Sequence, residues 1–153
     1  MILMKNRQVI GTAEIIEIPK ANLVNVPAKV DTGAYYSSIW ASNITVTDKG
    51  LEFVLFDKKS PLYSGKPIKV KNYYRSKIRN SFGHGEERFR IKLLIRVGKK
   101  SYKTDFTLAN RSINKYPILL GRSLLHDRFI VDVTKKDVHF NKLQTKLGKE
   151  SKL

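Results

Sequence analysis

The sequence predicts an all-β, barrel-like domain with one short helix. In many short segments, apolar and polar residues alternate with a period of two, and glycine or proline interrupts these segments. One apolar run passes through a glycine into a helix-like stretch. Many short strands with a single short helix are typical of a closed or partly open β-barrel. With 153 residues, the chain is long enough for one domain with a substantial core.

The first half of the chain predicts strands and a hairpin. Residues 8–18 predict a strand, which Pro19 ends because proline lacks an amide donor for the ladder. Residues 23–30 predict the next strand, since apolar residues occupy every second position. Residues 43–47 and 51–56 then predict a hairpin across a glycine-containing turn.

The second half contains the clearest strand, at residues 89–97, where apolar side chains occupy one face and Arg90, Lys92 and Arg96 the other. A polar, glycine-punctuated loop is expected at residues 80–88. Further strands are expected at residues 68–71, 102–108, 129–133 and 138–140. Residues 117–125 predict a buried strand, a glycine break and the short helix. We expect residues 1–143 to form the domain and residues 144–153 a basic, mobile tail.

The charge is the unusual feature of the composition. Thirty Lys and Arg residues against 13 Asp and Glu residues give a net charge of +17, which favours anionic partners such as nucleic acid, acidic peptide or a ribosome surface. A basic surface kept for solubility is the alternative. Residues 58–79 hold eight basic residues and no acidic one, with Tyr73 and Tyr74 among them. Such a mixture suits a single-stranded nucleic-acid groove. It also suits an edge hairpin whose lysines prevent aggregation, which we favour.

The sequence predicts a cytoplasmic protein without a membrane partner. No apolar run is long enough for a secretory signal or a membrane span. Cysteine is absent, which excludes disulfides and thiolate metal sites and fits a reducing compartment.

Residues 28–34, Ala-Lys-Val-Asp-Thr-Gly-Ala, carry the strongest chemical signal. A period of two puts Val30 and Asp31 on opposite faces, so the strand is buried while the acid projects into a cleft. Gly33 permits a sharp turn and close approach of the backbone. Asp-Thr-Gly is the signature of aspartic peptidases, and an ordinary turn is the alternative.

The chain resembles the RimB-type branch of the retropepsin-like peptidases over roughly residues 8–140. Four segments occur in the family's order. They are Ala28-Lys29-Val30-Asp31-Thr32-Gly33-Ala34 with Ser37-Ser38; Asn80-Ser81-x-Gly83 followed by Glu87-Arg88; Phe106-Thr107-Leu108-x-Asn110-Arg111; and Leu119-Leu120-Gly121-Arg122-Ser123-x-Leu125. Proteins of this branch are often labelled ATP-dependent zinc proteases.

The resemblance implies a closed-barrel aspartic peptidase that acts as a homodimer, with Asp31, Thr32 and Gly33 in the catalytic turn. It also implies a glutamate tail on a small-subunit ribosomal protein as substrate, built by an ATP-grasp glutamate ligase and trimmed by the peptidase. We assign substrate binding to Ala34, Ser37, Ser38, Arg79, Ser81, Glu87, Arg88 and Arg122.

Some of these assignments leave alternatives open. Ser37 and Ser38 either satisfy nearby backbone groups, which we favour, or contact substrate. Residues 58–88 are expected to form either a closing flap or an open rim over the site. Basic residues in or near this segment are suited to neutralise glutamate carboxylates; they are Lys77, Arg79, Arg88 and Lys92. In retroviral enzymes an acidic residue after Asp-Thr-Gly-Ala pairs with the arginine of the last segment. Here Tyr35 occupies that place, which leaves the partner of Arg122 open.

The sequence predicts neither zinc nor ATP, and no cofactor. The only histidines, His84, His126 and His139, are scattered and form no His-Glu-x-x-His pair, and no phosphate-binding Gly-rich loop is present.

Peptide hydrolysis without a metal or a nucleophilic side chain needs two carboxylates that share one proton. The chain has one Asp-Thr-Gly, so the second carboxylate must come from another copy across a twofold axis, where Thr32 would hydrogen-bond to its twin. We therefore predict an aspartic endopeptidase for acidic peptides such as a glutamylated ribosomal protein. The alternative is a non-catalytic retropepsin-like module that binds RNA or the ribosome in a salt-dependent manner.

Overall fold

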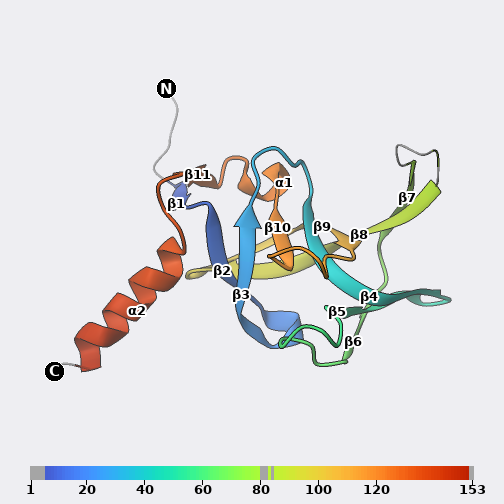
Figure 1. Cartoon of the computed structure of the whole chain (residues 1–153), viewed down its shortest axis with the longest axis horizontal. Helices are drawn as coiled ribbons and strands as arrows, with labels where there is room; N and C mark the ends of the chain where they lie inside the picture. Colours follow the sequence, from blue (N-terminus) through green and yellow to red (C-terminus); the bar gives the residue numbers. More distant parts are fainter. Residues whose placement is uncertain (1–5, 80–82, 84, 152–153) are drawn as a thin grey trace.

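A computed structural model of the chain describes residues 6–79, 83 and 85–151 (Figure 1). The described part is mostly β-structure, as predicted. Its strands are β1 (Gln8–Ile10), β2 (Ala13–Ile18), β3 (Leu23–Val30), β4 (Ser37–Thr47), β5 (Gly50–Leu55), β6 (Pro67–Val70), β7 (Tyr74–Arg79), β8 (Gly85–Val97), β9 (Lys100–Ala109), β10 (Ile118–Leu120) and β11 (Phe129–Val131). Its helices are the short α1 (Arg122–Leu125), the longer α2 (Val138–Ser151) and a single 3-10 turn, η1 (Pro19–Ala21).

Six of the strands close into a barrel. They pair in the order β10, β3, β2, β8, β9 and β4, and β4 pairs back onto β10. The alternation predicted for residues 89–97 is confirmed, because Phe89, Ile91 and Leu93 are buried and Lys92 and Leu94 are exposed. The barrel therefore holds the core, and every second residue of β8 faces outward.

Two hairpins extend from this barrel. β4 and β5 form the predicted hairpin, and β5 also pairs with β6, which lies where a strand was predicted at residues 68–71. β7 was not predicted; it pairs with β8 and the two form an arm that reaches beyond the barrel (Figure 1). The expected loop at residues 80–88 is shorter than predicted, because residues 85–88 belong to β8 and are paired with β7.

The strand predicted at residues 8–18 is divided at Gly11 and Thr12. A side chain at Gly11 would overlap the backbone of Lys135, and the Thr12 amide donates to the Lys135 carbonyl at 2.8 Å. The chain therefore bends there, and β1 leaves the barrel to pair in parallel with β11.

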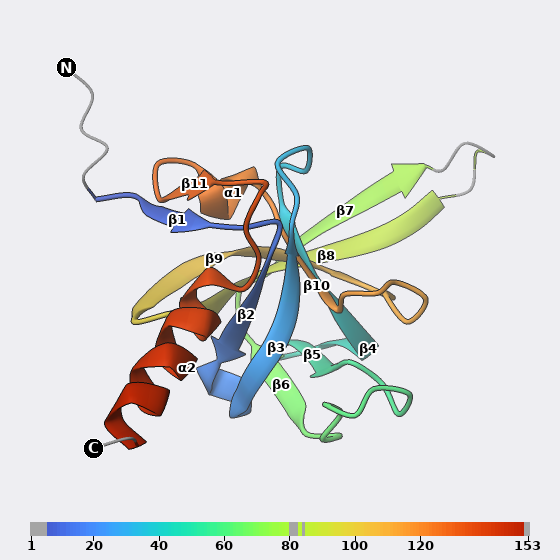
Figure 2. The same ribbon diagram turned by 60° about the vertical axis from the view of Figure 1, so that its left-hand side comes forward.

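The strand predicted at residues 138–140 is wrong, because these residues begin helix α2. Glu14 of β2 is fully buried and caps the helix: its carboxylate accepts hydrogen bonds from the Val138 amide at 3.1 Å and the His139 amide at 3.3 Å. Burial lowers the pKa of His139, an effect that the nearby Glu14 opposes. Residues 144–151, expected to belong to a tail, continue this helix alongside β2 (Figure 2). The domain boundary at residue 143 stays a prediction.

Candidate active site

The Asp-Thr-Gly segment and the second apolar segment of the sequence are neighbours in the barrel. β3 pairs in parallel with β10, so that Val30 lies opposite Leu120. The Asp31 amide continues this ladder and donates to the Leu120 carbonyl at 2.9 Å. Asp31 therefore begins its turn from a backbone position that a core strand fixes.

The turn orients the Asp31 carboxylate. Its Oδ1 accepts a hydrogen bond from the Gly33 amide at 2.9 Å. A Cβ at residue 33 would lie 3.2 Å from that oxygen, so glycine lets the backbone of residue 33 lie close to the carboxylate without crowding. Asp31 is half-buried and Thr32 is exposed, which leaves one side of the turn open to a second molecule.

Helix α1 underlies the turn and is joined to it by backbone hydrogen bonds. The Arg122 amide donates to the Ala34 carbonyl at 2.8 Å, and the Ser123 amide donates to the Tyr35 carbonyl at 2.7 Å. Gly121 makes this contact possible, since a Cβ there would lie 2.6 Å from the Tyr36 carbonyl oxygen. The glycine break that the sequence contains is thus required by the packing of the turn on α1.

Arg122 has a partner that the sequence left open. Its guanidinium donates to the Thr32 carbonyl at 3.0 Å, and its Cζ lies 5.8 Å from the centre of the Tyr35 ring. In the retroviral pattern an acidic residue pairs with this arginine. Here a backbone carbonyl of the turn and an aromatic ring take its place.

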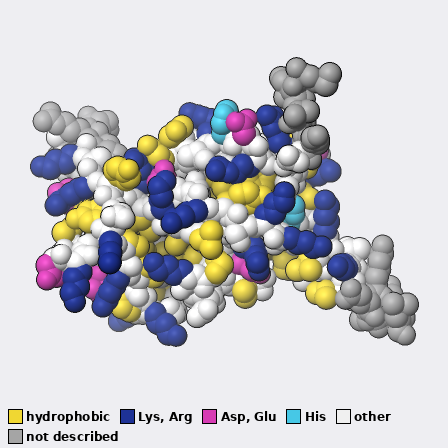
Figure 3. Space-filling view, turned by 180° about the vertical axis from the view of Figure 1, so that it is seen from behind, with side chains coloured by type: hydrophobic (Ala, Val, Ile, Leu, Met, Phe, Trp, Pro, Cys, Tyr) yellow, Lys and Arg dark blue, Asp and Glu magenta, His cyan; other side chains and the backbone are white. Residues whose placement is uncertain are grey.

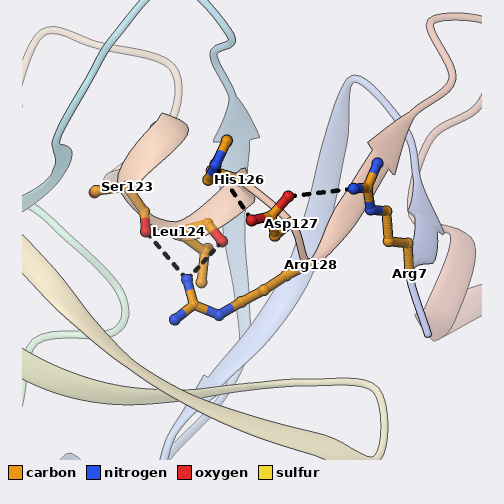
Figure 4. A network of polar contacts seen from close by, with 6 residues as sticks. All are labelled: Arg7, Ser123, Leu124, His126, Asp127 and Arg128. Carbon is orange, nitrogen blue, oxygen red and sulfur yellow. Dashed lines mark hydrogen bonds and ion pairs between the residues drawn. The ribbon is translucent and has the colours of Figure 1, made fainter. Parts of the chain in front are cut away.

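A polar network fixes the other end of α1 (Figure 4). The Arg128 guanidinium donates to the carbonyls of Ser123 and Leu124 at 3.1 and 3.0 Å, which satisfies acceptors that the short helix leaves free. Asp127 pairs with Arg7 at 3.2 Å and with His126 at 3.3 Å. The helix beneath the turn is therefore held at both ends.

A cavity of about 490 Å³ lies beside the turn, between it and the arm formed by β7 and β8. Ala34 and Ser38 line it from the turn and β4, and Ser76 lines it from the arm. Three arginines, Arg88, Arg90 and Arg111, also line it, and none of its lining residues is acidic. An anionic ligand is therefore favoured there.

Arg90 is held between two aromatic rings in this cavity. Its Cζ lies 4.3 Å from the centre of the Tyr36 ring and 4.3 Å from that of Tyr74. Its Nε is buried without a hydrogen-bond partner and lies 3.9 Å from Asp105. The stacking restricts the rotation of the side chain and presents the end of the guanidinium in a fixed plane.

Arg111 lines the cavity and is affected by the charge of Asp31. Its Nε donates to the Tyr116 carbonyl at 3.1 Å. Burial lowers the pKa of Arg111, and the negative charge of Asp31 opposes that shift. The Arg111 guanidinium therefore lies within electrostatic reach of Asp31.

The remaining predicted residues are distributed as follows. Ser37 is buried and its hydroxyl accepts a hydrogen bond from the Gly121 amide at 3.0 Å, which is the backbone-satisfying role of the two considered. Ser38 and Arg88 line the cavity. Glu87 forms an exposed ion pair with Arg75 at 2.7 Å. Arg79 belongs to β7, and Ser81 lies outside the described residues.

Several cavity residues were not predicted as site residues: Tyr36, Tyr74, Arg90, Asn110 and Arg111. Arg111 lies in one of the four family-like segments, so its position there was a usable signal. The alternation in residues 89–97 also predicted that Arg90 faces outward. No sequence pattern indicates that Tyr36 and Tyr74 contact Arg90, because the three residues come from a turn and two separate strands.

Among the described residues, no group of three or more His, Cys, Asp or Glu side chains is placed to hold a metal ion. His84 lies outside that part of the chain. None of the described helices has both the length and the apolar character needed to cross a membrane.

Known proteins resemble this chain in sequence. A protein of Desulfotalea psychrophila named "Probable alpha-L-glutamate ligase" is 33% identical over 154 residues, which cover 95% of this chain and 31% of that protein. A Shewanella pealeana protein of the same name is 32% identical over 132 residues, which cover 83% of this chain and 29% of that protein. The chain thus spans about a third of the length of these relatives.

A solved structure has the same fold. It is the crystal structure of a Legionella pneumophila protein of unknown function, with a TM-score of 0.65 and 29% sequence identity, covering 84% of this chain and 95% of that one. A family described as "Retropepsin-like aspartic endopeptidase RimB" matches residues 9–142. The chain therefore belongs to the RimB-like family of retropepsin-like aspartic endopeptidases.

Proposed function

We propose that this chain is an aspartic endopeptidase that acts as a homodimer and hydrolyses peptide bonds in acidic, glutamate-rich chains such as a glutamylated ribosomal protein. One observation carries the proposal. The Asp31 turn is fixed by β10 and α1 and lies beside a cavity that three arginines line. Such a site joins a carboxylate that is suited to proton transfer to a surface that favours anions.

The chemistry requires the partner subunit. With Asp31 of each subunit at hydrogen-bonding distance, the two carboxylates hold one proton between them, because two carboxyl groups so close together do not both ionise. The ionised carboxylate takes a proton from water, whose oxygen attacks the scissile carbonyl. The protonated carboxylate donates its proton to that carbonyl oxygen. The first carboxylate then passes the proton that it took from water to the amide nitrogen, and the C–N bond breaks as the second carboxylate takes its proton back from the former carbonyl oxygen.

Residues of the turn maintain this geometry within each subunit. The Gly33 amide holds Oδ1 of Asp31, and the Arg122 guanidinium holds the Thr32 carbonyl. Thr32 is exposed, as a residue that hydrogen-bonds across a twofold axis must be before assembly. The substrate would occupy the cavity between the turn and the arm, with Ala34 and Ser38 along it.

The relatives support a glutamate-containing substrate. Their name connects them with glutamate ligation, and they contain additional chain beyond the part that this chain matches. A peptidase that accompanies a glutamate ligase would act on the glutamate chain that the ligase makes. We propose that ligase as a functional partner and the cytoplasm as the site of both activities.

The test compares wild-type protein with Asp31→Asn on a peptide that ends in a run of glutamates. Loss of the proton-transfer group is expected to lower the cleavage rate by about a thousandfold or more, with an unchanged thermal midpoint. Mass spectrometry of the products measures the rate, and sedimentation measures the dimer.

The matched control is Asp48→Asn, which makes the same charge change in the turn between β4 and β5. It should cleave at the wild-type rate. Cleavage by Asp31→Asn at the rate of Asp48→Asn would contradict the proposed chemistry. A wild-type protein that cleaves as a monomer would contradict the shared dyad.

A further inference from the structure

The cavity of about 490 Å³ beside the Asp31 turn, which Ala34 and Ser38 line, is called the Asp31 cavity below. Beyond it, a second and larger cavity continues along the outer face of β8. Its volume is about 830 Å³. Arg90 and Tyr74 line both cavities, so the two are contiguous. We call the second cavity the basic groove. Six basic side chains line it: Lys20, Lys69, Lys71, Arg90, Lys92 and Lys103.

The lining of the basic groove carries charge of one sign. The described lining includes no acidic side chain. On the face shown in Figure 3, Lys and Arg are spread across the whole surface, which follows from the net charge alone. Six cations around one cavity concentrate the positive potential, because low-dielectric walls focus the field.

The cations of β8 are spaced regularly from the Asp31 cavity into the groove. Arg88 and Arg90 line the first cavity, and Arg90 and Lys92 line the second. Residues two apart on a strand repeat at about 6.7 Å on one face. The alternate side chains of an extended peptide repeat at the same interval. The row of Arg88, Arg90 and Lys92 therefore matches the spacing of every second carboxylate of an extended acidic chain.

The row already accommodates one carboxylate. Asp105 on β9 lies 3.6 Å from the Lys92 ammonium and 3.9 Å from Nε of Arg90, and it offsets part of their charge. Lys92 is 57% exposed and Arg90 is 25% exposed. The stacking of Arg90 on Tyr36 and Tyr74 fixes its guanidinium before any ligand arrives, which lowers the entropic cost of binding.

The tyrosines distinguish between an acidic peptide and a nucleic acid. A single-stranded nucleic-acid site uses aromatic faces for base stacking. Here one face of the Tyr74 ring carries Arg90, and Tyr73 packs against Phe89 with ring centres 6.0 Å apart. Tyr74 is 59% exposed and offers a base one ring face, whereas a single-stranded site stacks successive bases on several aromatic faces, so the groove favours carboxylates over bases.

We propose that the basic groove is an extended subsite that binds the acidic side chains of the substrate several residues away from the scissile bond. The inference rests on the proposed function, which places the scissile bond of the substrate at the Asp31 turn. It adds that the affinity for the substrate depends on the number of glutamates. Arg88 and Lys92 are about 13 Å apart along the strand. A chain of two glutamates fills only the first cavity, whereas one of six or more reaches Lys92 and Lys103.

The experiment measures binding apart from cleavage. The Asp31→Asn variant of this chain is titrated against fluorescein-labelled peptides of two, four, six and eight glutamates, and anisotropy gives the affinity. Affinity should rise at least about tenfold from two to six glutamates and then level off. Adding Lys92→Gln and Lys103→Gln should remove that rise. Adding Lys49→Gln and Lys66→Gln instead, which line neither cavity and make the same charge change, should preserve it.

Three outcomes overturn the inference. One is an affinity that does not depend on length, and another is an equal effect of the two charge-matched pairs of substitutions. The third is an oligouridine probe that loses affinity with Lys92→Gln and Lys103→Gln while octaglutamate does not, which would assign the groove to RNA. Length-dependent binding by Asp31→Asn supports the inference even where the wild-type protein fails to cleave, so failure of the subsite and failure of the peptidase are distinguishable.

Discussion

The Asp31 turn and the arm of β7 and β8 border the same cavity but are held in place by different kinds of contact. The turn is fixed by buried or backbone hydrogen bonds to β10 and α1. The arm carries exposed side chains, and its ion pair between Arg75 and Glu87 is 48% and 42% exposed. Buried polar contacts cost much when one partner is lost, whereas exposed ion pairs cost little. The molecule therefore places the candidate chemistry where buried contacts fix the backbone. It places the charge recognition of the outer arm on exposed side chains, with the stacked Arg90 as the fixed point between the two regions.

A Gly→Ala substitution made once in each region should give the largest difference in stability between them. Gly121→Ala places a Cβ 2.6 Å from the Tyr36 carbonyl oxygen, and a backbone group cannot rotate away as a side chain does. We expect a loss of about 3 kcal/mol in the free energy of unfolding. The thermal midpoint should fall by about 6–12 °C. Gly85→Ala on the arm meets no atom within 4 Å and should change the unfolding free energy by less than about 0.5 kcal/mol. Equal effects in thermal unfolding would remove the distinction.

A hydroxyl beneath the turn gives a smaller but more specific effect. Ser37→Ala leaves the buried Gly121 amide without its acceptor and should cost about 1–3 kcal/mol. Ser38→Ala, the adjacent residue of β4, removes a hydroxyl that lines the cavity and should cost less than about 0.5 kcal/mol. Urea unfolding of both variants measures the difference. A larger loss for Ser38→Ala would mean that the turn is held from the cavity side instead.

The sequence predicted the barrel well because its strands are encoded locally. The alternation in β8 and the apolar run ending at Gly121 indicate burial within a few residues of each position. Contacts between distant residues were not predictable in this way. Helix α2 depends on Glu14, whose carboxylate accepts from the Val138 amide 124 positions later. No pattern within residues 138–140 reports that cap, so a short apolar run was taken for a strand.

The candidate site divides along the same line. Asp31 and Gly33 were identifiable from the Asp-Thr-Gly signature, and Gly121 as the break after an apolar run, because each signal lies within a few residues of the chain. Arg90 was identifiable only as one outward cation of β8. Its stacking between two tyrosines depends on β7, which was itself not predicted, and on the turn after Asp31. Recognition residues that are assembled from several elements are therefore the part that sequence patterns miss.

The ion pair of the arm should give the smallest effect and one that salt abolishes. Glu87→Gln removes the charged partner of Arg75, at 2.7 Å, and should cost less than about 1 kcal/mol at low ionic strength, because both groups are largely exposed. Near 1 M salt, screening over about 3 Å should reduce the cost to almost nothing. The loss in Ser37→Ala should persist at the same salt concentration, since it comes from desolvation of a buried amide and not from exposed charges. Urea unfolding at the two salt concentrations measures both variants. A salt-independent loss above about 2 kcal/mol for Glu87→Gln would show that the arm is as rigidly held as the turn, and the division between chemistry and recognition would then need another physical basis.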